Sequence, residues 1–246
     1  MNLLVQYHSH PNVSSGRNKL FNKIIKQREE NVKKRGCSID KVLTYNPTSA
    51  GLSDFISKNA KIFRIKRGAG LWIWKPFIVL DALLNHSEEG DIIFYYDANH
   101  NNLKNVNLSV LFDYVEKYGN LFHETSAYTM CEKRWTKRDL FITMDCDSPK
   151  YTETPQVQAT WFFLKNNKQN RDFARMWLHF CSFFLNLSRG STHIFKKDED
   201  FQAHREDQSV LSLLCKKHNM NIFQGQAHGN KNIQLFLDWF NLKFVR

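Results

Sequence analysis

The sequence predicts an α/β fold in which a mostly parallel central sheet is flanked by helices. Two observations lead to this prediction. Short apolar runs rich in β-branched and aromatic residues, typical of buried strands, alternate along the chain with amphipathic helical patterns. The chain also contains no internal repeat and no stretch with the composition of a linker, so residues 1–246 are predicted to form a single domain.

The N-terminal part begins with a predicted strand at Leu3 and continues into a basic amphipathic helix over residues 17–30. A short strand is predicted over residues 41–45, and a helix over residues 52–59, where Leu, Phe and Ile recur at helical spacing. A further helix opens at Pro76, because proline is favourable in the first turn, and it has one apolar face.

The run DIIFYY over residues 91–96 is the clearest strand signal in the chain, because it is short, β-branched, aromatic and almost entirely apolar. A loop is predicted over residues 101–107 and an amphipathic helix over residues 108–118. The remaining predicted elements are strands over 127–130 and 158–164, and helices over 138–144, 169–187, 207–217 and 233–244.

The composition indicates a globular protein with an anionic partner. Apolar residues make up 42% and charged residues 24% of the 246 residues, and the net charge is +11. This basic excess predicts that the partner is a nucleic acid, an anionic membrane surface or a phosphorylated small molecule. The chain has no apolar run long enough to span a membrane, its first residues do not have the pattern of a signal peptide, and its five cysteines are scattered without a CxxC pair. We therefore expect a cytoplasmic protein with reduced thiols.

A carboxylate and an amide follow the 91–96 strand. Asp97 and Asn99 come directly after it, and ligands of open α/β sheets bind at the carboxyl ends of the strands. Both side chains offer hard oxygen ligands, which suit Mg²⁺ or Mn²⁺ when substrate phosphates complete the shell. The alternative is that these residues only cap a turn, as Asp and Asn commonly do.

The segment RGAGLWIWKP over residues 67–76 combines two glycines, two cations and two tryptophans. Arg67 and Lys75 suit phosphate, and the start of the following helix adds the positive end of a helix dipole. Trp72 and Trp74 are predicted either to line a cleft or to belong to the core. No phosphate-binding GxxxxGK[ST] loop is present.

The segment HREDQS over residues 204–209 places two acids where a helix begins. Acids at this position are favoured by the helix dipole, so Glu206 and Asp207 need no further role; the alternative is that one is a general base. Adjacent helical residues point about 100° apart, so we expect one to face a ligand and the other to face solvent or a basic neighbour. The pair is predicted to lie at the mouth of the helix, outside the core.

In their order and spacing, these segments resemble nucleotide-sugar glycosyltransferases of the GT-A fold. The resemblance is closest to a microbial and viral group with RGxGYWxWKP, GDxxxYxDA(G/N), a xKRDxF segment and HRxDQS. It spans most of the chain, and it implies a single GT-A, Rossmann-like domain. Leu71 stands where the group has Tyr, and Asn99 where it often has Gly and the wider fold a second Asp.

The resemblance also implies an activity. The protein would transfer a sugar from a nucleoside-diphosphate donor, with UDP favoured, to a hydroxyl of a glycan or glycolipid, as in glycan biosynthesis. Mn²⁺ or Mg²⁺ would assist, held by Asp97, Asn99 and a late histidine, His228. The catalytic base would be Asp207. The donor would contact six residues: Arg67, Trp74, Lys75, Tyr96, Asp97 and Gln208.

Several alternatives stay open. The Glu206-Asp207 pair resembles inverting enzymes, whereas Asp207-Gln208 also resembles a retaining group. The basic run over residues 133–138 is expected to be a solvated loop, and no nucleic-acid-binding signature accompanies it, so no nucleic-acid partner is expected. A nucleic-acid- or carbohydrate-binding module without catalysis is the competing class. The basic charge is compatible with peripheral contact with a membrane.

Overall fold

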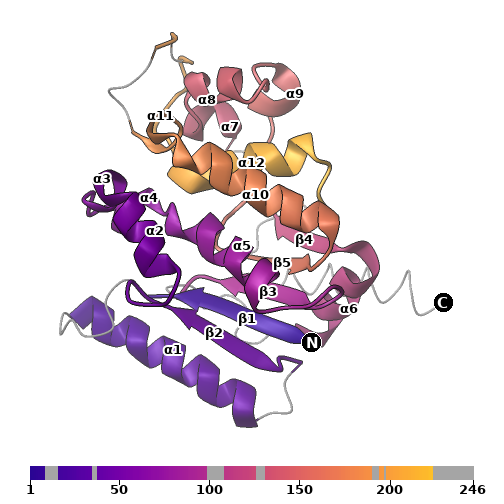
Figure 1. Cartoon of the computed structure of the whole chain (residues 1–246). Coiled ribbons are helices and arrows are strands. Elements are labelled where there is room, and N and C mark those ends of the chain that lie inside the picture. The colour runs from indigo at the N-terminus through magenta and orange to yellow at the C-terminus, as the bar shows by residue number, and fades with distance from the viewer. Residues whose placement is uncertain are drawn as a thin grey trace.

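A computed structural model describes residues 1–8, 16–34, 38–98, 108–125, 131–189, 194–196 and 198–223. Its centre is one six-stranded sheet with the strand order β2-β1-β3-β5-β4-β6 (Figure 1). The strands are β1 (Asn2–Tyr7), β2 (Lys41–Tyr45), β3 (Ile92–Tyr96), β4 (Asn120–His123), β5 (Trp161–Lys165) and β6 (Ile222–Phe223).

The sheet is mostly parallel, as the sequence predicts. β1 runs parallel to β2 and β3, and β4 runs parallel to β6. β5 is the exception, because it is inserted between β3 and β4 and runs antiparallel to both. The fold is therefore α/β with one reversed strand at the centre of the sheet.

Helices cover both faces of the sheet (Figure 1). They are α1 (Gly16–Lys34), α2 (Leu52–Lys58), α3 (Ala60–Phe63), α4 (Gly68–Leu71), α5 (Trp74–Asn85), α6 (Leu108–Tyr118), α7 (Glu132–Trp135), α8 (Arg138–Thr143), α9 (Pro149–Thr152), α10 (Lys168–Ser182), α11 (Phe184–Leu187) and α12 (Glu206–Lys217). Helices α5, α10 and α12 pack on one face, whereas α6 packs on the other.

Alternation along β3 divides its side chains between these two cores. Ile93 and Tyr95 face the core under α5, α10 and α12, whereas Phe94 and Tyr96 face the core under α6. The last residues of β3 therefore present alternate side chains to opposite faces of the sheet, and this alternation decides which of them can reach the candidate site.

Most predicted elements are found where the sequence places them, with ends shifted by a few residues. The predicted helix over 169–187 is instead two helices, because Phe183 is extended (φ −85°, ψ 112°) and separates α10 from α11. Strands β4 and β6 and the short helices α3, α4, α7 and α9 were not predicted. The predicted loop over 101–107, strand over 127–130 and helix over 233–244 lie outside the described residues.

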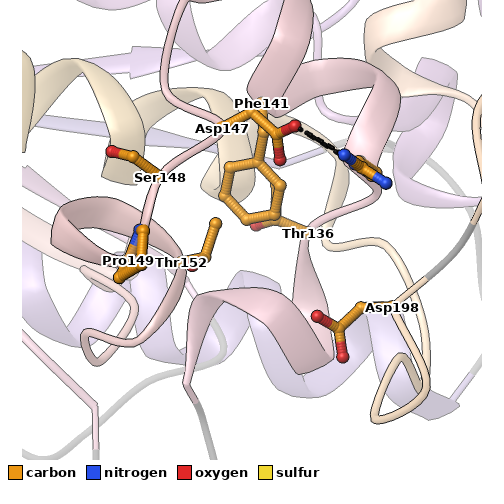
Figure 2. Close-up of a pocket in the computed structure, with 8 residues that line it drawn as sticks. Thr136, Phe141, Asp147, Ser148, Pro149, Thr152 and Asp198 are labelled. Atoms are coloured by element: carbon orange, nitrogen blue, oxygen red, sulfur yellow. Dashed lines mark hydrogen bonds and ion pairs between the residues drawn. The ribbon is translucent and has the colours of Figure 1, made fainter.

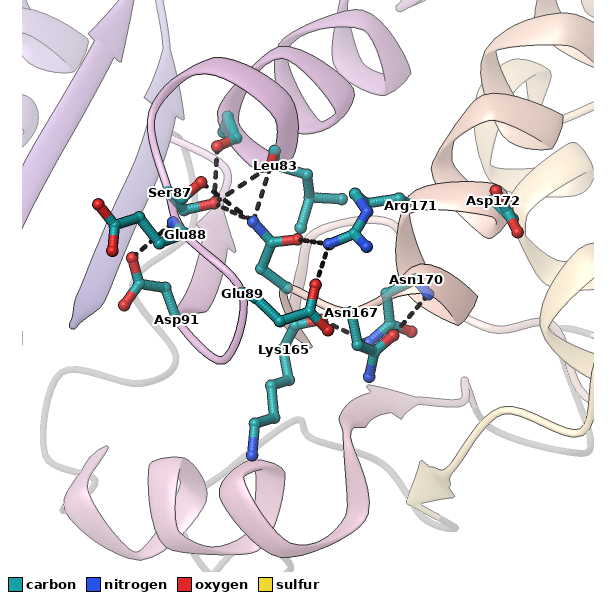
Figure 3. Close-up of polar contacts among 12 residues, drawn as sticks. Leu83, Ser87, Glu88, Glu89, Asp91, Lys165, Asn167, Asn170, Arg171 and Asp172 are labelled. Atoms are coloured by element: carbon teal, nitrogen blue, oxygen red, sulfur yellow. Dashed lines mark hydrogen bonds and ion pairs between the residues drawn. The ribbon is translucent and has the colours of Figure 1, made fainter.

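A network of polar side chains lies at the end of the sheet opposite the carboxyl end of β3 (Figure 3). The buried amide of Asn166 donates to Leu83 O (2.7 Å) and Ser87 Oγ (2.8 Å) at the end of α5. Arg171 of α10 donates to Asn166 Oδ1 (2.7 Å) and pairs with Glu89 (2.5 Å). These bonds tie α5, β5 and α10 into one frame, which carries the site at its other end.

Large apolar side chains are exposed at the start of α11 and in the segment around residue 194. Phe183, Phe184, Leu185, Ile194 and Phe195 are all exposed. None of the helices in the described ranges has both the length and the apolar character needed to cross a membrane.

Candidate functional site

Three segments that are distant in the sequence meet beyond the carboxyl end of β3. Asp97 follows β3, Lys75 lies in the first turn of α5, and Asp207 lies in the first turn of α12. The Lys75 Nζ lies 3.3 Å from Asp97 Oδ1 and 3.5 Å from Asp207 Oδ2, and it donates to the Ala159 carbonyl at 2.9 Å. A buried ammonium is thus held between two carboxylates.

The backbone and side chain of Asp97 are fixed from several directions. The Tyr95 hydroxyl donates to Asp97 Oδ1, and the Asp97 amide donates to Thr160 O at 2.8 Å. Arg28 of α1 donates to the Asp97 carbonyl at 3.0 Å and stacks over the Tyr96 ring, 3.8 Å from its centroid. Burial raises the pKa of Tyr95 well above its usual range, so Tyr95 stays a hydrogen-bond donor at physiological pH.

The two carboxylates differ in burial and protonation. The side chain of Asp97 is 16% exposed and that of Asp207 is 6% exposed, so Asp97 is the outer carboxylate. Burial, with a smaller contribution from the charges of Asp97 and Glu206, raises the pKa of Asp207 to about 7 despite the nearby ammonium. Among the described residues, Asp207 Oδ2 has the Lys75 ammonium at 3.5 Å as an ion-pair partner, and no group lies close enough to form a normal hydrogen bond with it. A carboxylate in this state can take up a proton at neutral pH.

Lys75 stays charged. Burial lowers the pKa of its ammonium, but the attraction of Asp207 and Asp97 outweighs burial, and the net shift is upward. The three acceptors around Nζ belong to the protein, so Lys75 holds the two acids in place and neutralises part of their charge. This geometry does not support the predicted direct contact between Lys75 and donor phosphate.

A second charged group lies beside this triad. Glu206 is buried, and its Oε1 accepts from Arg67 Nε at 2.6 Å and forms an ion pair with Arg189, whose Nε lies 2.8 Å away and donates to His204 O at 3.2 Å. The side chains of Arg67 and Arg189 remain 44% and 41% exposed. One carboxylate therefore orients two guanidinium groups that reach solvent, and this part of the site has a positive balance.

The chain between Arg67 and Lys75 takes an unusual path. Five consecutive residues have positive φ: Gly68 (57°), Ala69 (48°), Gly70 (97°), Leu71 (56°) and Trp72 (60°). The α4 turn is thus left-handed, which costs a non-glycine residue roughly 1–2 kcal/mol. Strain of this kind is concentrated at functional sites, where the surrounding structure enforces it. Here the turn sets the separation of Arg67 from Lys75.

The glycines of RGAGLW are explained by this turn. A Cβ on Gly68 would lie 2.3 Å from the Trp72 ring, and one on Gly70 would lie 2.8 Å from the Phe63 ring. The turn is closed by bonds from Leu71 N to Arg67 O (2.9 Å) and from the Trp74 indole to Gly68 O (2.8 Å). The motif thus encodes a backbone conformation rather than a phosphate loop.

Other predicted donor-contact residues lie deeper than expected. Trp74 is buried and stacks on Tyr7, with 3.7 Å between ring centroids, so it belongs to the core. Tyr96 points to the α6 face of the sheet beneath Arg28, away from Asp207, because strand alternation separates them. Gln208 donates to Gln156 Oε1 (2.9 Å) and accepts from the Ala159 amide (3.3 Å). Asn99 and His228 lie outside the described residues.

The expectation that Glu206 and Asp207 lie outside the core was wrong. Both are buried, because the N-terminus of α12 packs against α10, where Trp177 donates its indole N–H to Asp207 O at 3.1 Å. The two side chains do point in different directions, Glu206 toward arginines and Asp207 toward Lys75.

The basic run over residues 133–138 was expected to be a solvated loop, but Lys137 within it is fully buried. It donates to Ser188 O and Oγ, each at 3.2 Å.

Sequence reasoning missed three residues of the site. Tyr95 could have been found, because it lies two positions before Asp97 and the alternation of a strand points both side chains to one face. Arg28 and Arg189 lie in segments without any motif, and their roles follow only from tertiary packing. Within the described residues, no three His, Cys, Asp or Glu side chains are grouped as metal ligands.

Comparisons with known proteins add little to this geometry. No family model and no curated protein matches the sequence. Among solved structures, the chain is similar to 4-diphosphocytidyl-2C-methyl-D-erythritol synthase from Anaerococcus prevotii, with a TM-score of 0.41 and 13% identity. The alignment covers 100% of this chain and 98% of that chain.

Proposed function

We propose that the protein is a glycosyltransferase that uses a nucleoside-diphosphate sugar, with UDP as the nucleotide, and a hydroxyl of a glycan or glycolipid acceptor. The observation that carries the proposal is the triad Asp97–Lys75–Asp207 beside two half-exposed arginines held by Glu206. The order of the RGxG, DA and HRxDQS motifs, which supply most of these residues, supports the same activity.

Binding of the donor is assigned to the arginines. A diphosphate has several oxygens that accept hydrogen bonds from guanidinium groups, and such charge-assisted bonds are about twice as strong as neutral ones. Glu206 fixes Arg67 and Arg189 by their Nε atoms, so their outer ends are oriented before a ligand arrives. Less conformational entropy is then lost on binding.

The chemical step follows from the carboxylates. The bond between the anomeric carbon of the donor and the diphosphate oxygen breaks, and the acceptor oxygen forms a new bond to that carbon. The acceptor hydroxyl proton passes to Asp207, whose pKa of about 7 lets it take up a proton at neutral pH. The charge that develops on the departing diphosphate is stabilised by the fixed cations Arg67 and Arg189. This single displacement inverts the anomeric configuration.

The proposal includes a divalent cation bound by the carboxylate of Asp97. Among the described residues, Asp97 supplies one carboxylate at the outer edge of the triad, which fits Mg²⁺ or Mn²⁺ taking its other ligands from phosphates and water. Such an ion would neutralise charge on the diphosphate. We expect Mn²⁺ to tighten UDP binding measured by calorimetry, and Asp97→Asn to remove that gain. Equal UDP affinity with Mn²⁺ and with chelator would contradict the assignment.

Nucleotide binding tests the proposal directly. We expect UDP to raise the melting temperature and Arg67→Ala or Arg189→Ala to weaken UDP binding by about 1.5–3 kcal/mol, because each removes a charge-assisted contact. Arg175→Ala is the matched control, since Arg175 is an exposed arginine paired with Asp172 on α10. Equal losses in all three variants would show that only net charge matters.

The competing class predicts a different result. A nucleic-acid-binding module would bind single-stranded oligonucleotides with affinity that falls steeply with salt, and would show no stabilisation by UDP. A carbohydrate-binding module would bind glycans without any nucleotide.

The acceptor is also part of the proposal. The exposed apolar side chains around α11 are compatible with an acceptor attached to a lipid at a membrane surface.

A further inference from the structure

A buried lysine holds the chain just before Arg189. This arginine follows the end of α11, where the last backbone carbonyls of a helix have no partner within the helix. Lys137 Nζ donates to Leu185 O and, at 3.2 Å each, to Ser188 O and Ser188 Oγ. An ammonium has three N–H groups, so all of them are used on α11 and its last residues.

His204 bonds the same end of the helix. Its ring is fully buried, its Nε2 donates to Asn186 O at 2.7 Å, and its Nδ1 accepts from the Lys137 amide at 3.3 Å. A carbonyl only accepts and an amide N–H only donates, so these two partners place the ring proton on Nε2. Together the two side chains bond three of the four backbone carbonyls of residues 185–188, immediately before Arg189.

The chain is also held after Arg189, and the arginine side chain is held directly. Asp139 Oδ1 accepts from the Ile194 amide at 2.6 Å. Arg189 Nε donates to His204 O at 3.2 Å and lies 2.8 Å from Glu206 Oε1. The KRD and HRED segments of the sequence therefore meet around this one arginine.

The middle residue of the KRD segment points elsewhere. Arg138 pairs with Asp147 at 3.0 Å, on the wall of a pocket of about 250 Å³ between α8 and α9 (Figure 2). Its side chain is 44% exposed, close to the 41% of Arg189, but its partner belongs to the segment between α8 and α9 rather than to α11. Arg138 is therefore a suitable comparison for its neighbour Lys137.

We infer that Lys137 and His204 are positioning residues, which hold Arg189 where it binds the diphosphate of the donor. The inference rests on the proposed function, in which Arg189 contacts the diphosphate. An ammonium whose described acceptors are all neutral is costly to bury, and an anchored backbone leaves less freedom to be lost when the ligand binds. The alternative is that the two residues only stabilise the packing of α11.

A double-mutant cycle separates the two roles, with calorimetry of UDP binding to the full chain as the measurement. We expect Lys137→Met and His204→Phe each to weaken UDP binding at least about fivefold when Arg189 is present, and by less than about twofold in an Arg189→Ala background. His204→Gln should regain most of the affinity of His204→Phe, because the glutamine amide can still donate to Asn186 O.

Arg138→Ala and His218→Phe are the matched controls and should bind UDP like the wild type. Arg138 adjoins Lys137 in the sequence, and His218 lies at the opposite end of α12 from His204. A loss of UDP affinity that is equally large with and without Arg189 would show a general structural effect. Unchanged affinity in folded Lys137→Met and His204→Phe would show that Arg189 does not depend on them. Either result overturns the inference and leaves the proposed function intact.

A second readout needs no nucleotide. The Nε–H of an ion-paired arginine exchanges slowly with water, so that of Arg189 should give a sharp signal in a heteronuclear NMR spectrum, identified by its loss in Arg189→Lys. We expect this signal to broaden or vanish in Lys137→Met and His204→Phe and to persist in both controls, with the backbone amide signals reporting that each variant folds.

The NMR result also separates the two proposals. An unchanged Arg189 signal in the folded variants overturns the inference whether or not UDP binds. Loss of the signal in a protein that does not bind UDP would contradict the proposed function, while the hold of Lys137 and His204 on Arg189 would stand. If Lys137→Met does not fold, His204→Phe and His204→Gln decide the outcome.

Discussion

Asp207→Asn should lower turnover of a nucleotide sugar by about 10²–10⁴-fold while leaving UDP affinity nearly unchanged. The asparagine keeps the shape of the side chain but cannot take the acceptor proton at neutral pH. Wild-type turnover should rise with pH through about 7, the pKa that burial gives Asp207, and then level off. This ionisation should be missing from the residual activity of the variant. Initial rates of UDP release between pH 5.5 and 9 measure both effects.

Two neighbouring variants decide the assignment. Glu206→Gln should act mainly on UDP affinity, because Glu206 orients Arg67 and Arg189 rather than the reacting atoms. Asp97→Asn should act through the divalent cation. An active Asp207→Asn together with an inactive Glu206→Gln would reverse the roles of the two acids. A product with the anomeric configuration of the donor would exclude single displacement with Asp207 as the base.

The same pKa shift has a consequence for stability. The pKa of Asp207 is 3.8 in an unperturbed carboxyl and about 7 in the folded protein, so the folded state binds more protons between these values. The free energy of unfolding contributed by Asp207 therefore falls as pH rises from about 4 to 7. Asp207→Asn should remove this part of the pH dependence of the unfolding free energy. The same unfolding curves show whether the variant is folded, and therefore whether a loss of turnover is due to misfolding.

Lys75→Met should be the most destabilising substitution in the site, at about 3–5 kcal/mol of unfolding free energy at pH 8. Methionine fills similar volume, but it leaves Asp97 and Asp207 close together without the ammonium that lies between them. The effect should shrink as pH falls below the pKa of Asp207, because a neutral acid is less costly to bury. Urea unfolding at pH 5 and pH 8 measures the difference.

A double variant distinguishes charge from packing. Lys75→Met combined with Asp207→Asn should regain part of the lost stability, because only one buried carboxylate then lacks its partner. Lys168→Met, at an exposed ion pair with Asp172, is the control and should change stability little. If the double variant is as unstable as the sum of the single ones, the loss comes from packing around α5 rather than from the charges.

The fold was accessible from the sequence wherever periodicity was strong. The segments that form β1, β3 and β5 are apolar and aromatic. The segments that form α6 and α12 have apolar residues at helical spacing. β4 has only four residues, and its pairing with β5 is not encoded in any local pattern. The break between α10 and α11 at Phe183 also has no local signal in the sequence, because no Gly or Pro lies there.

The site was only partly accessible. Asp97, Arg67 and Asp207 were found because motif order and the end of a strand point to them, and the structure brings Asp97 and Asp207 to one ammonium. The role of Lys75 as the centre of that group could not be read from the chain, since burial and the ion pairs arise from packing between α5, β3 and α12. Arg189 enters the site only because Glu206 is buried beside it.

The structure of the complex with UDP and an unreactive UDP-sugar analogue tests the central claim most directly. The account predicts the diphosphate within hydrogen-bond distance of both Arg67 and Arg189, with the anomeric carbon facing Asp207. Nucleotide bound away from both arginines, or a sugar turned away from Asp207, would contradict it.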